Sequence, residues 1–121
     1  GEGIFIAGGA GVTPFIAILK QLEKENKIGN NKLIFANKTK ADIILEDKLK
    51  TLLGNNFIKV LSDEDLDGYE HGFISAALIK NHIEANTKYY YLCGPPPMMN
   101  AIENILASLG VKENQIVKES F

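Results

Sequence analysis

The sequence predicts an α/β protein built on a three-layer, five-stranded parallel sheet with helices on both faces. Three observations predict this class. Short apolar runs of strand length alternate with amphipathic stretches of helix length along the whole chain. Glycine or proline clusters separate them. The 121 residues, of which 45% are hydrophobic, suffice for one domain with its own core.

The apolar runs fix where strands are expected, and the periodic stretches between them fix the helices. Strands are expected at Ile4–Ile6, Leu33–Ala36, Phe57–Leu61, Lys88–Leu92 and Gln115–Ser120. Helices are expected from Pro14 to the polar stretch that begins at Lys24, over Asp42–Leu53, over Ala76–His82 behind a Ser75 cap, and over Met98–Leu109. Right-handed crossovers cover both faces of the sheet, and the expected strand order is 3-2-1-4-5.

Composition and charge disfavour several classes of function. The net charge is −2 and all 13 basic residues are lysine, so we expect no binding to nucleic acid. A single cysteine and the lack of a long apolar run predict a cytoplasmic protein without membrane insertion. The loop Asp63–Gly68 copies the first half of a calcium-binding loop, but Ile74 stands where the bidentate glutamate belongs, so no metal site is expected.

The first strand runs into the segment GGAGVTP at residues 8–14, which predicts a phosphate-binding turn. Its glycines permit φ > 0 and a close approach of a ligand to the backbone. Thr13 as N-cap and Pro14 as first helical residue would turn the exposed N–H groups of the helix toward that ligand. Proline replaces the third glycine of the usual GxGxxG pattern, so this is a variant pyrophosphate turn, with a plain tight connection as the alternative.

A second special turn, CGPPPM at residues 93–98, joins the fourth strand to the last helix. The helical periodicity after its prolines favours a rigid strand-to-helix turn over a polyproline linker. The expected order places the first and fourth strands side by side at the switch point where ligands bind. The two turns therefore predict one shared ligand crevice.

With GGAGVTPF at 8–15, LIFANKTKADIIL at 33–45, CGPPPM at 93–98 and ESF at 119–121, the chain resembles the NAD(P)-binding domain of the ferredoxin-NADP reductase superfamily. The ANKT-x-x-DIIL segment is most similar to the NADH-dependent cytochrome reductase and nitrate reductase branch. The resemblance implies a flavin-dependent oxidoreductase that passes a hydride from NADH or NADPH to FAD or FMN, and electrons onward to a ferredoxin, flavodoxin or haem protein. The alternative is a regulatory module that binds a nucleotide without redox chemistry.

The resemblance also implies that residues 1–121 are one NAD(P)-binding domain excised from a longer chain. The antiparallel barrel that binds the flavin would precede Gly1, because no such barrel can be recognised in this sequence. Since the flavin carries the hydride chemistry, the domain alone is expected to be inactive.

Site residues follow from the matching motifs. The pyrophosphate would lie on Gly9, Ala10, Gly11 and Thr13. The nicotinamide would lie beside Cys93, Gly94 and Pro95, with Met98 in the cleft, Glu119 near the pocket and Phe121 over the flavin. Cys93 and Glu119 would be the catalytic pair. The alternatives are a buried small apolar residue for Cys93, a helix core residue for Met98, and packing on its own domain for Phe121.

The end of the second strand is where the adenosine ribose is expected, beside Asn37 and Lys38. Asp42 would hydrogen-bond a free 2′-hydroxyl and repel a 2′-phosphate, whereas Lys38 and Lys40 would attract that phosphate. Because no arginine is available for a bidentate phosphate contact, the sequence favours NADH over NADPH.

Overall fold

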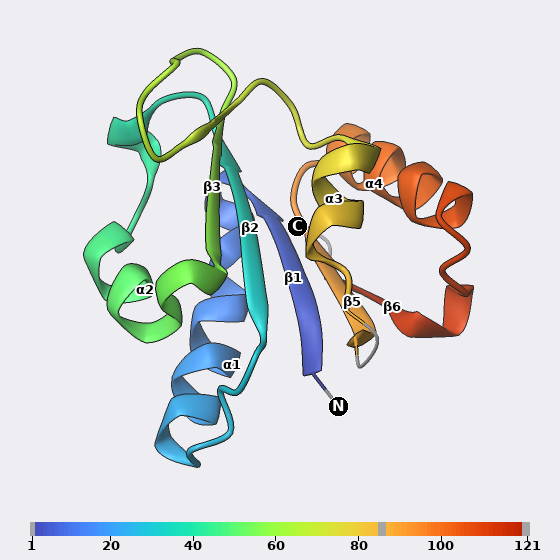
Figure 1. The fold of residues 1–121 in the computed structure, drawn as a ribbon, viewed down its shortest axis with the longest axis horizontal. Coiled ribbons are helices and arrows are strands. Elements are labelled where there is room, and N and C mark those ends of the chain that lie inside the picture. Colours follow the sequence, from blue (N-terminus) through green and yellow to red (C-terminus); the bar gives the residue numbers. More distant parts are fainter. Residues whose placement is uncertain (1, 85–86, 120–121) are drawn as a thin grey trace.

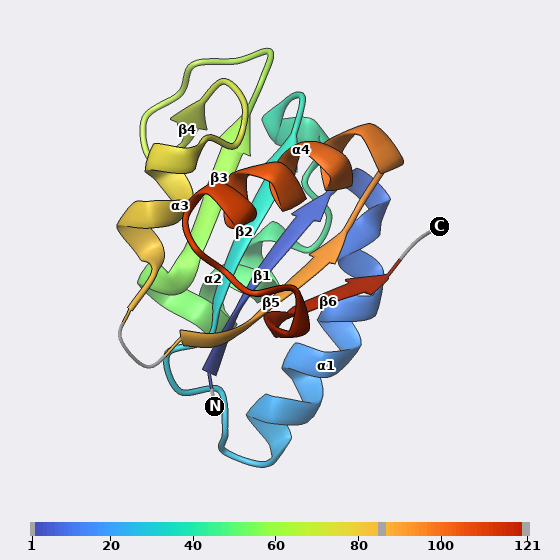
Figure 2. The same ribbon diagram turned by 90° about the vertical axis from the view of Figure 1, so that its right-hand side faces the viewer.

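The computed structural model describes residues 2–84 and 87–119, and in this part of the chain six parallel strands form one sheet (Figure 1 and Figure 2). Their order is β4-β3-β2-β1-β5-β6. The strands are β1 (Glu2–Gly8), β2 (Lys32–Asn37), β3 (Phe57–Leu61), β4 (Glu70–His71), β5 (Thr87–Cys93) and β6 (Ile116–Glu119). The predicted order is confirmed, because β5 and β6 are the expected fourth and fifth strands. The sequence missed β4, a two-residue edge strand that pairs with Val60 and Leu61.

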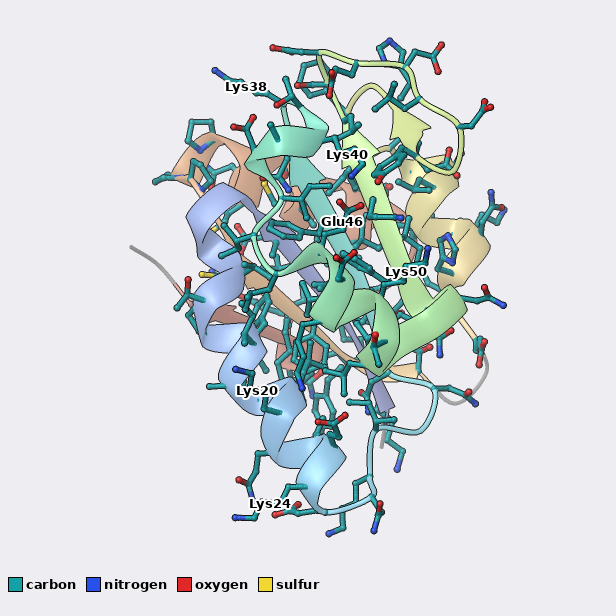
Figure 3. All side chains as sticks on the ribbon, turned by 90° about the vertical axis from the view of Figure 1, so that its left-hand side faces the viewer. Lys20, Lys24, Lys38, Lys40, Glu46 and Lys50 are labelled. Atoms are coloured by element: carbon teal, nitrogen blue, oxygen red, sulfur yellow. The ribbon has the colours of Figure 1, made fainter. Side chains whose placement is uncertain are left out.

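Helices cover both faces of the sheet, as predicted. Helices α1 (Thr13–Lys24) and α2 (Glu46–Leu53) lie on one face, which is turned toward the viewer in Figure 3. Helices α3 (Ala76–His82) and α4 (Pro96–Ser108) lie on the other, in front of the sheet in Figure 2. Short 3-10 turns add η1 (Gly9–Val12), η2 (Lys40–Asp42), η3 (Gly54–Asn56) and η4 (Glu113–Gln115).

The core is split into two layers by the sheet, and alternation along the strands explains why. In β1, Phe5 packs toward α1 while Ile4 and Ile6 pack toward α3 and α4. All three side chains are fully buried. In β5, Tyr90 is buried on the α4 face, whereas the ring of Tyr91 stacks on Phe5 with centroids 4.4 Å apart. Strand β1 is thus buried on both faces, as its apolar run predicted.

Three predicted helix starts are wrong. Helix α4 begins at Pro96 and not at Met98, because prolines fit the first turn of a helix. The other two differ for local reasons. Thr13 is the first residue of α1 and not its N-cap, because η1 already coils the chain and Val12 occupies the cap position without a side-chain hydrogen bond. Helix α2 begins at Glu46 and not at Asp42. The Asp42 carboxylate instead closes a capping box with Thr39 on η2, and Leu45 then adopts a left-handed φ of 53°. The Ser75 cap is confirmed by a 3.1 Å hydrogen bond that its Oγ accepts from Leu78 N.

Two further properties concern metals and membranes. Within the described ranges, no group of three or more His, Cys, Asp or Glu side chains is arranged to hold a metal ion. None of the helices in these ranges has both the length and the apolar character needed to cross a membrane.

Candidate functional site

A cleft of about 1010 Å³ runs along the carboxyl ends of β1, β2 and β3 and is closed on its other side by the first turns of α4. Six of the residues predicted for the site line it, namely Gly9, Asn37, Lys38, Asp42, Pro95 and Met98. Parallel α/β sheets bind ligands at this position. The strand order reverses there, so the connections on the two sides lead away from each other and leave a crevice at the carboxyl ends of the strands.

The two special turns lie against each other at one end of this cleft. In the sheet register, Ala7 at the end of β1 is the neighbour of Cys93 at the end of β5. The Met98 thioether packs over both turns: a Cβ built on Gly94 would lie 3.1 Å from Met98 Sδ, and a Cβ on Gly8 would lie closer still. The strand order therefore brings together the glycine turn and the proline turn, as the sequence predicted.

Gly9 and Gly11 have different roles in the first turn. Gly9 has a φ of 55°, and an added Cβ would meet nothing within 4 Å, so its backbone is open to the cleft. Gly11 is buried, and a Cβ there would lie 2.5 Å from Cys93 O and 3.0 Å from Gly94 Cα. The backbone of the neighbouring turn therefore makes the close approach to Gly11. The sequence had suggested that a ligand makes this approach.

Several other predicted residues do not line the cleft. Cys93 is 1% exposed and belongs to the core layer of Val12 and Phe15, an environment typical of a small apolar residue. Gly94 is buried and Thr13 is exposed on the first turn of α1. The backbone of Glu119 pairs with Cys93 in the sheet. The side chains of Glu119 and Ala10, and the whole of Phe121, lie outside what the structure describes.

Asn37 lines the cleft and carries a buried, unsatisfied polar group. Its backbone oxygen accepts a hydrogen bond from Ser62 N at 3.0 Å. Its side-chain Nδ2 is buried, and no acceptor for it is found among the described residues. Buried donors without partners cost about 1–3 kcal/mol, so they are rare outside functional sites. An oxygen of a bound nucleotide would satisfy this donor once the amide turns toward the cleft, so the residues present fit such a ligand.

Charged groups surround the end of β2, and most of them are already engaged. Asp42 Oδ2 accepts hydrogen bonds from Thr39 N at 3.1 Å and Thr39 Oγ1 at 3.0 Å. The Lys40 ammonium pairs with Glu46 Oε1 at 3.0 Å and does not line the cleft. Lys38 lines the cleft and extends outward at its rim (Figure 3). Of the two lysines considered for a phosphate, the structure leaves Lys38 at the cleft.

Sequence reasoning missed the outer wall of the cleft, formed by Gly72, Phe73 and Ile74. The Phe73 side chain is 85% exposed, which is unusual for a large apolar residue on a small domain. The available signal was the apolar pair behind Gly72 in an otherwise acidic loop. The acidic loop was expected to end at Gly68, and no role was assigned to Phe73. The other missed lining residues are Gly8, Ala36, Ile44, Ser62, Pro97, Ala101 and Ile102.

Comparison with known proteins gives one family and several relatives. The family model for the Oxidoreductase NAD-binding domain matches residues 5–104. NADH-cytochrome b5 reductase 1 of Aspergillus terreus is 38% identical over 119 residues, which cover 87% of this chain and 40% of that protein. The chain thus spans less than half the length of this relative.

Two solved structures share the fold. The cytochrome b5 reductase domain of Ulva prolifera nitrate reductase superposes with a TM-score of 0.83 at 27% identity, over 98% of this chain and 49% of that one. The FAD/NAD binding domain of nitric oxide dioxygenase from Vibrio cholerae gives a TM-score of 0.87 at 28% identity, over 98% of this chain and 50% of that one.

Proposed function

The chain belongs to the oxidoreductase NAD-binding domain family, and from this premise we propose that it binds the nicotinamide nucleotide of a flavin-dependent reductase. The predicted resemblance to the cytochrome reductase and nitrate reductase branch is confirmed. The observation that carries the proposal is the unsatisfied Asn37 Nδ2 in a cleft at the sheet's switch point. A family fold alone would not require that donor.

The nucleotide crosses the carboxyl end of the sheet. Its adenosine half lies between the end of β2 and the outer wall, where Asn37 supplies a donor and Phe73 an apolar face. Its pyrophosphate lies over Gly9, whose side of the turn is open. Its nicotinamide reaches the junction of the two turns, where Pro95 and Met98 line the cleft. A cleft of this size matches a drug-sized or larger ligand.

A flavin held by a barrel domain outside this chain would supply the hydride acceptor. The residues of this chain orient the nicotinamide and exclude water around it. Cys93 lies behind the nicotinamide pocket and positions the nicotinamide from there. Glu119 lies next to Cys93, because the two residues pair in the sheet. Electrons then pass to a ferredoxin, flavodoxin or haem protein. The reductase relative named for cytochrome b5 supports a haem protein.

NADH is the preferred nucleotide. Asp42, Asp63 and Glu64 follow the ends of β2 and β3, and Glu64 Oε1 accepts a 2.6 Å hydrogen bond from Lys40 N across these two loops. Their carboxylates repel a ribose 2′-phosphate. Lys40 is neutralised by Glu46, which leaves Lys38 as a flexible point charge against them. The relative from Aspergillus terreus is named an NADH enzyme, which supports the same preference.

The test is calorimetric titration of the 121-residue chain with NADH, beside the variant Asn37→Ala and the control Asn55→Ala on the exposed η3 turn. We expect Asn37→Ala to weaken NADH binding by about three- to tenfold, the equivalent of one hydrogen bond. Its unfolding free energy should stay level or rise, because an unsatisfied buried donor disappears. Unaltered affinity in this variant would contradict the assignment of Asn37 to the site.

Absence of any NADH binding to the unaltered chain would refute the proposed function itself. The isolated chain is expected to be colourless, since the flavin belongs to the other domain; a visible flavin spectrum would contradict the two-domain interpretation. A chain that binds NADH but supports no hydride transfer in the flavin-containing protein would favour a regulatory module.

A further inference from the structure

A charged cluster outside the cleft holds the segment that forms its outer wall. We call it the Glu46 cluster; its members are Glu46, Lys40, Lys59 and Tyr69. Glu46 is the first residue of α2, Lys40 begins η2, Lys59 lies in β3, and Tyr69 belongs to the loop after β3. Four separate segments therefore meet at one carboxylate, and in Figure 3 the Lys40 and Glu46 side chains converge in front of the sheet.

Each partner of Glu46 contributes a distinct contact. Tyr69 Oη donates a hydrogen bond to Glu46 Oε2. Lys40 Nζ lies 3.0 Å from Glu46 Oε1, and Lys59 Nζ lies 3.7 Å from Glu46 Oε2. Lys59 also stands 4.3 Å from the centroid of the Tyr69 ring, within the range of a cation–π contact. The Glu46 and Lys59 side chains are each only 14% exposed, so solvent screens them less than an ordinary surface pair.

The protonation state of Glu46 suits this role. Burial raises the pKa of its carboxyl group, but the hydrogen bonds from Tyr69 and Lys40 and the charges of Lys40 and Lys59 outweigh burial. The net pKa lies below its ordinary value. Glu46 is therefore an ionised acceptor at neutral pH, and hydrogen bonds to ionised acceptors are the stronger kind.

Tyr69 connects this cluster to the cleft over a very short stretch of chain. It directly precedes β4, and the outer wall of Gly72, Phe73 and Ile74 directly follows β4. Strand β4 has only two residues in register with β3, and the pairing ends with a 2.8 Å hydrogen bond that Gly72 N donates to Leu61 O, so Phe73 and Ile74 lie beyond the sheet. Gly68 and Gly72 flank the Tyr69–His71 stretch with φ of 85° and 108°, in the left-handed region that favours glycine.

We propose that Glu46 is a positioning residue: through Tyr69 it fixes the outer wall of the cleft and thereby sets the affinity for the adenosine half of the nucleotide. This rests on the proposed function, because the wall matters for binding only if the cleft holds a nucleotide. Glu46 does not itself line the cleft. Its effect is confined to the half of the ligand that the wall covers, since Pro95 and Met98 at the other end belong to separate segments.

The experiment compares the 121-residue chain with Glu46→Gln, with Tyr69→Phe and with the control Glu23→Gln. The control removes a carboxylate on α1 whose pair with Lys48, at 4.0 Å, is about half exposed and does not involve Tyr69. Each protein is titrated with 5′-AMP and, by NMR, with nicotinamide mononucleotide. Amide hydrogen exchange of residues 66–74 is measured without any ligand.

We expect Glu46→Gln and Tyr69→Phe to raise the Kd of 5′-AMP by about three- to tenfold, the equivalent of one hydrogen bond. The Kd of nicotinamide mononucleotide should change less than about twofold, since additivity holds for distant sites. Exchange at residues 66–74 should accelerate in both variants and not in the control. Tyr69→Phe keeps the ring, so it separates the hydrogen bond from packing.

An equal loss of affinity for both ligand halves would overturn the proposal, because it would indicate general destabilisation. Unchanged exchange at residues 66–74 would overturn it as well. If the unaltered chain binds neither ligand, the proposed function is wrong; the exchange measurement, which needs no ligand, then still decides whether Glu46 fixes the wall.

Discussion

Among the glycines near the cleft, Gly11 is the one most tightly constrained by backbone atoms, and Gly11→Ala tests this constraint. A Cβ at this position would lie 2.5 Å from Cys93 O and 2.7 Å from Cys93 C. The first distance is about 0.9 Å short of the 3.4 Å at which ordinary contact begins. The obstacle is backbone on a neighbouring strand, so no side-chain rotation relieves it. Residues 9–12 and the end of β5 must move apart.

The expected loss of unfolding free energy is about 2–4 kcal/mol, at or slightly above the usual range for overpacking a core. The entropy that alanine removes from the unfolded chain opposes this by less than about 1 kcal/mol. For a domain of this size the loss corresponds to a Tm lower by roughly 8–16 °C. Urea unfolding of the 121-residue chain, followed by far-UV circular dichroism, measures the free energy directly.

Gly9→Ala is the matched control, because it alters the same turn without a steric obstacle. Its φ of 55° predicts a loss of only about 1 kcal/mol, from the left-handed backbone alone. If Gly11→Ala unfolds within about 0.5 kcal/mol of the unaltered chain yet no longer binds NADH, the steric argument is wrong. Gly11 would then serve the approach of the pyrophosphate, as the sequence first suggested.

Three further outcomes are expected. Cys93→Ala should lower the free energy of unfolding by about 1 kcal/mol, because it leaves a small cavity. In the flavin-containing enzyme, stopped-flow flavin reduction should show slower hydride transfer with little change in NADH affinity. Equal rates of flavin reduction in the variant and the unaltered enzyme would mean that Cys93 serves packing alone. Because the pKa of Glu46 is lowered in the folded state from its ordinary 4.5, its stabilisation is complete above that pH and is lost as pH falls through the lower folded pKa. Urea unfolding at about pH 3 to 6 should therefore show a shallower acid decline for Glu46→Gln, and identical slopes would contradict the cluster's electrostatics. Asp42→Ala should raise the kcat/KM of the enzyme for NADPH relative to NADH, and an unmoved ratio would remove Asp42 from nucleotide selection.

The strands and the location of the cleft could be predicted because they depend on local signals. Strand β3 has the predicted bounds, Phe57–Leu61, since a polar turn stands on each side of its apolar run. The cleft follows from the strand order once two ligand-type turns are found on neighbouring strands. The part of the cleft formed by the glycine turn and the proline turn could therefore be predicted from the sequence.

What could not be predicted depends on local backbone geometry and side-chain pairing that hydrophobic periodicity does not report. Ile43, Ile44 and Leu45 share the apolar periodicity of α2. The capping box at Asp42 and the left-handed φ of Leu45 keep these residues out of the helix, which begins at Glu46. The ion pair between Lys40 and Glu46 joins η2 to α2. The sequence alone had suggested that Lys40 was available to bind a phosphate. No pattern in a single sequence reports this ion pair, because it depends on how η2 and the start of α2 fold against β3.

The position of β1 in the sheet has a consequence for how the chain acquires its structure. Strand β1 pairs on one side with β2, whose residues follow about thirty positions later, as in Ile6 beside Ile34. On its other side it pairs with β5, as in Ile6 beside Leu92. During synthesis, a strand with an apolar centre, Ile4–Ala7, thus has one edge unpaired until most of the chain has been made. We expect slow folding dominated by this distant pairing, and aggregation of chains truncated before β5, where that open edge would persist.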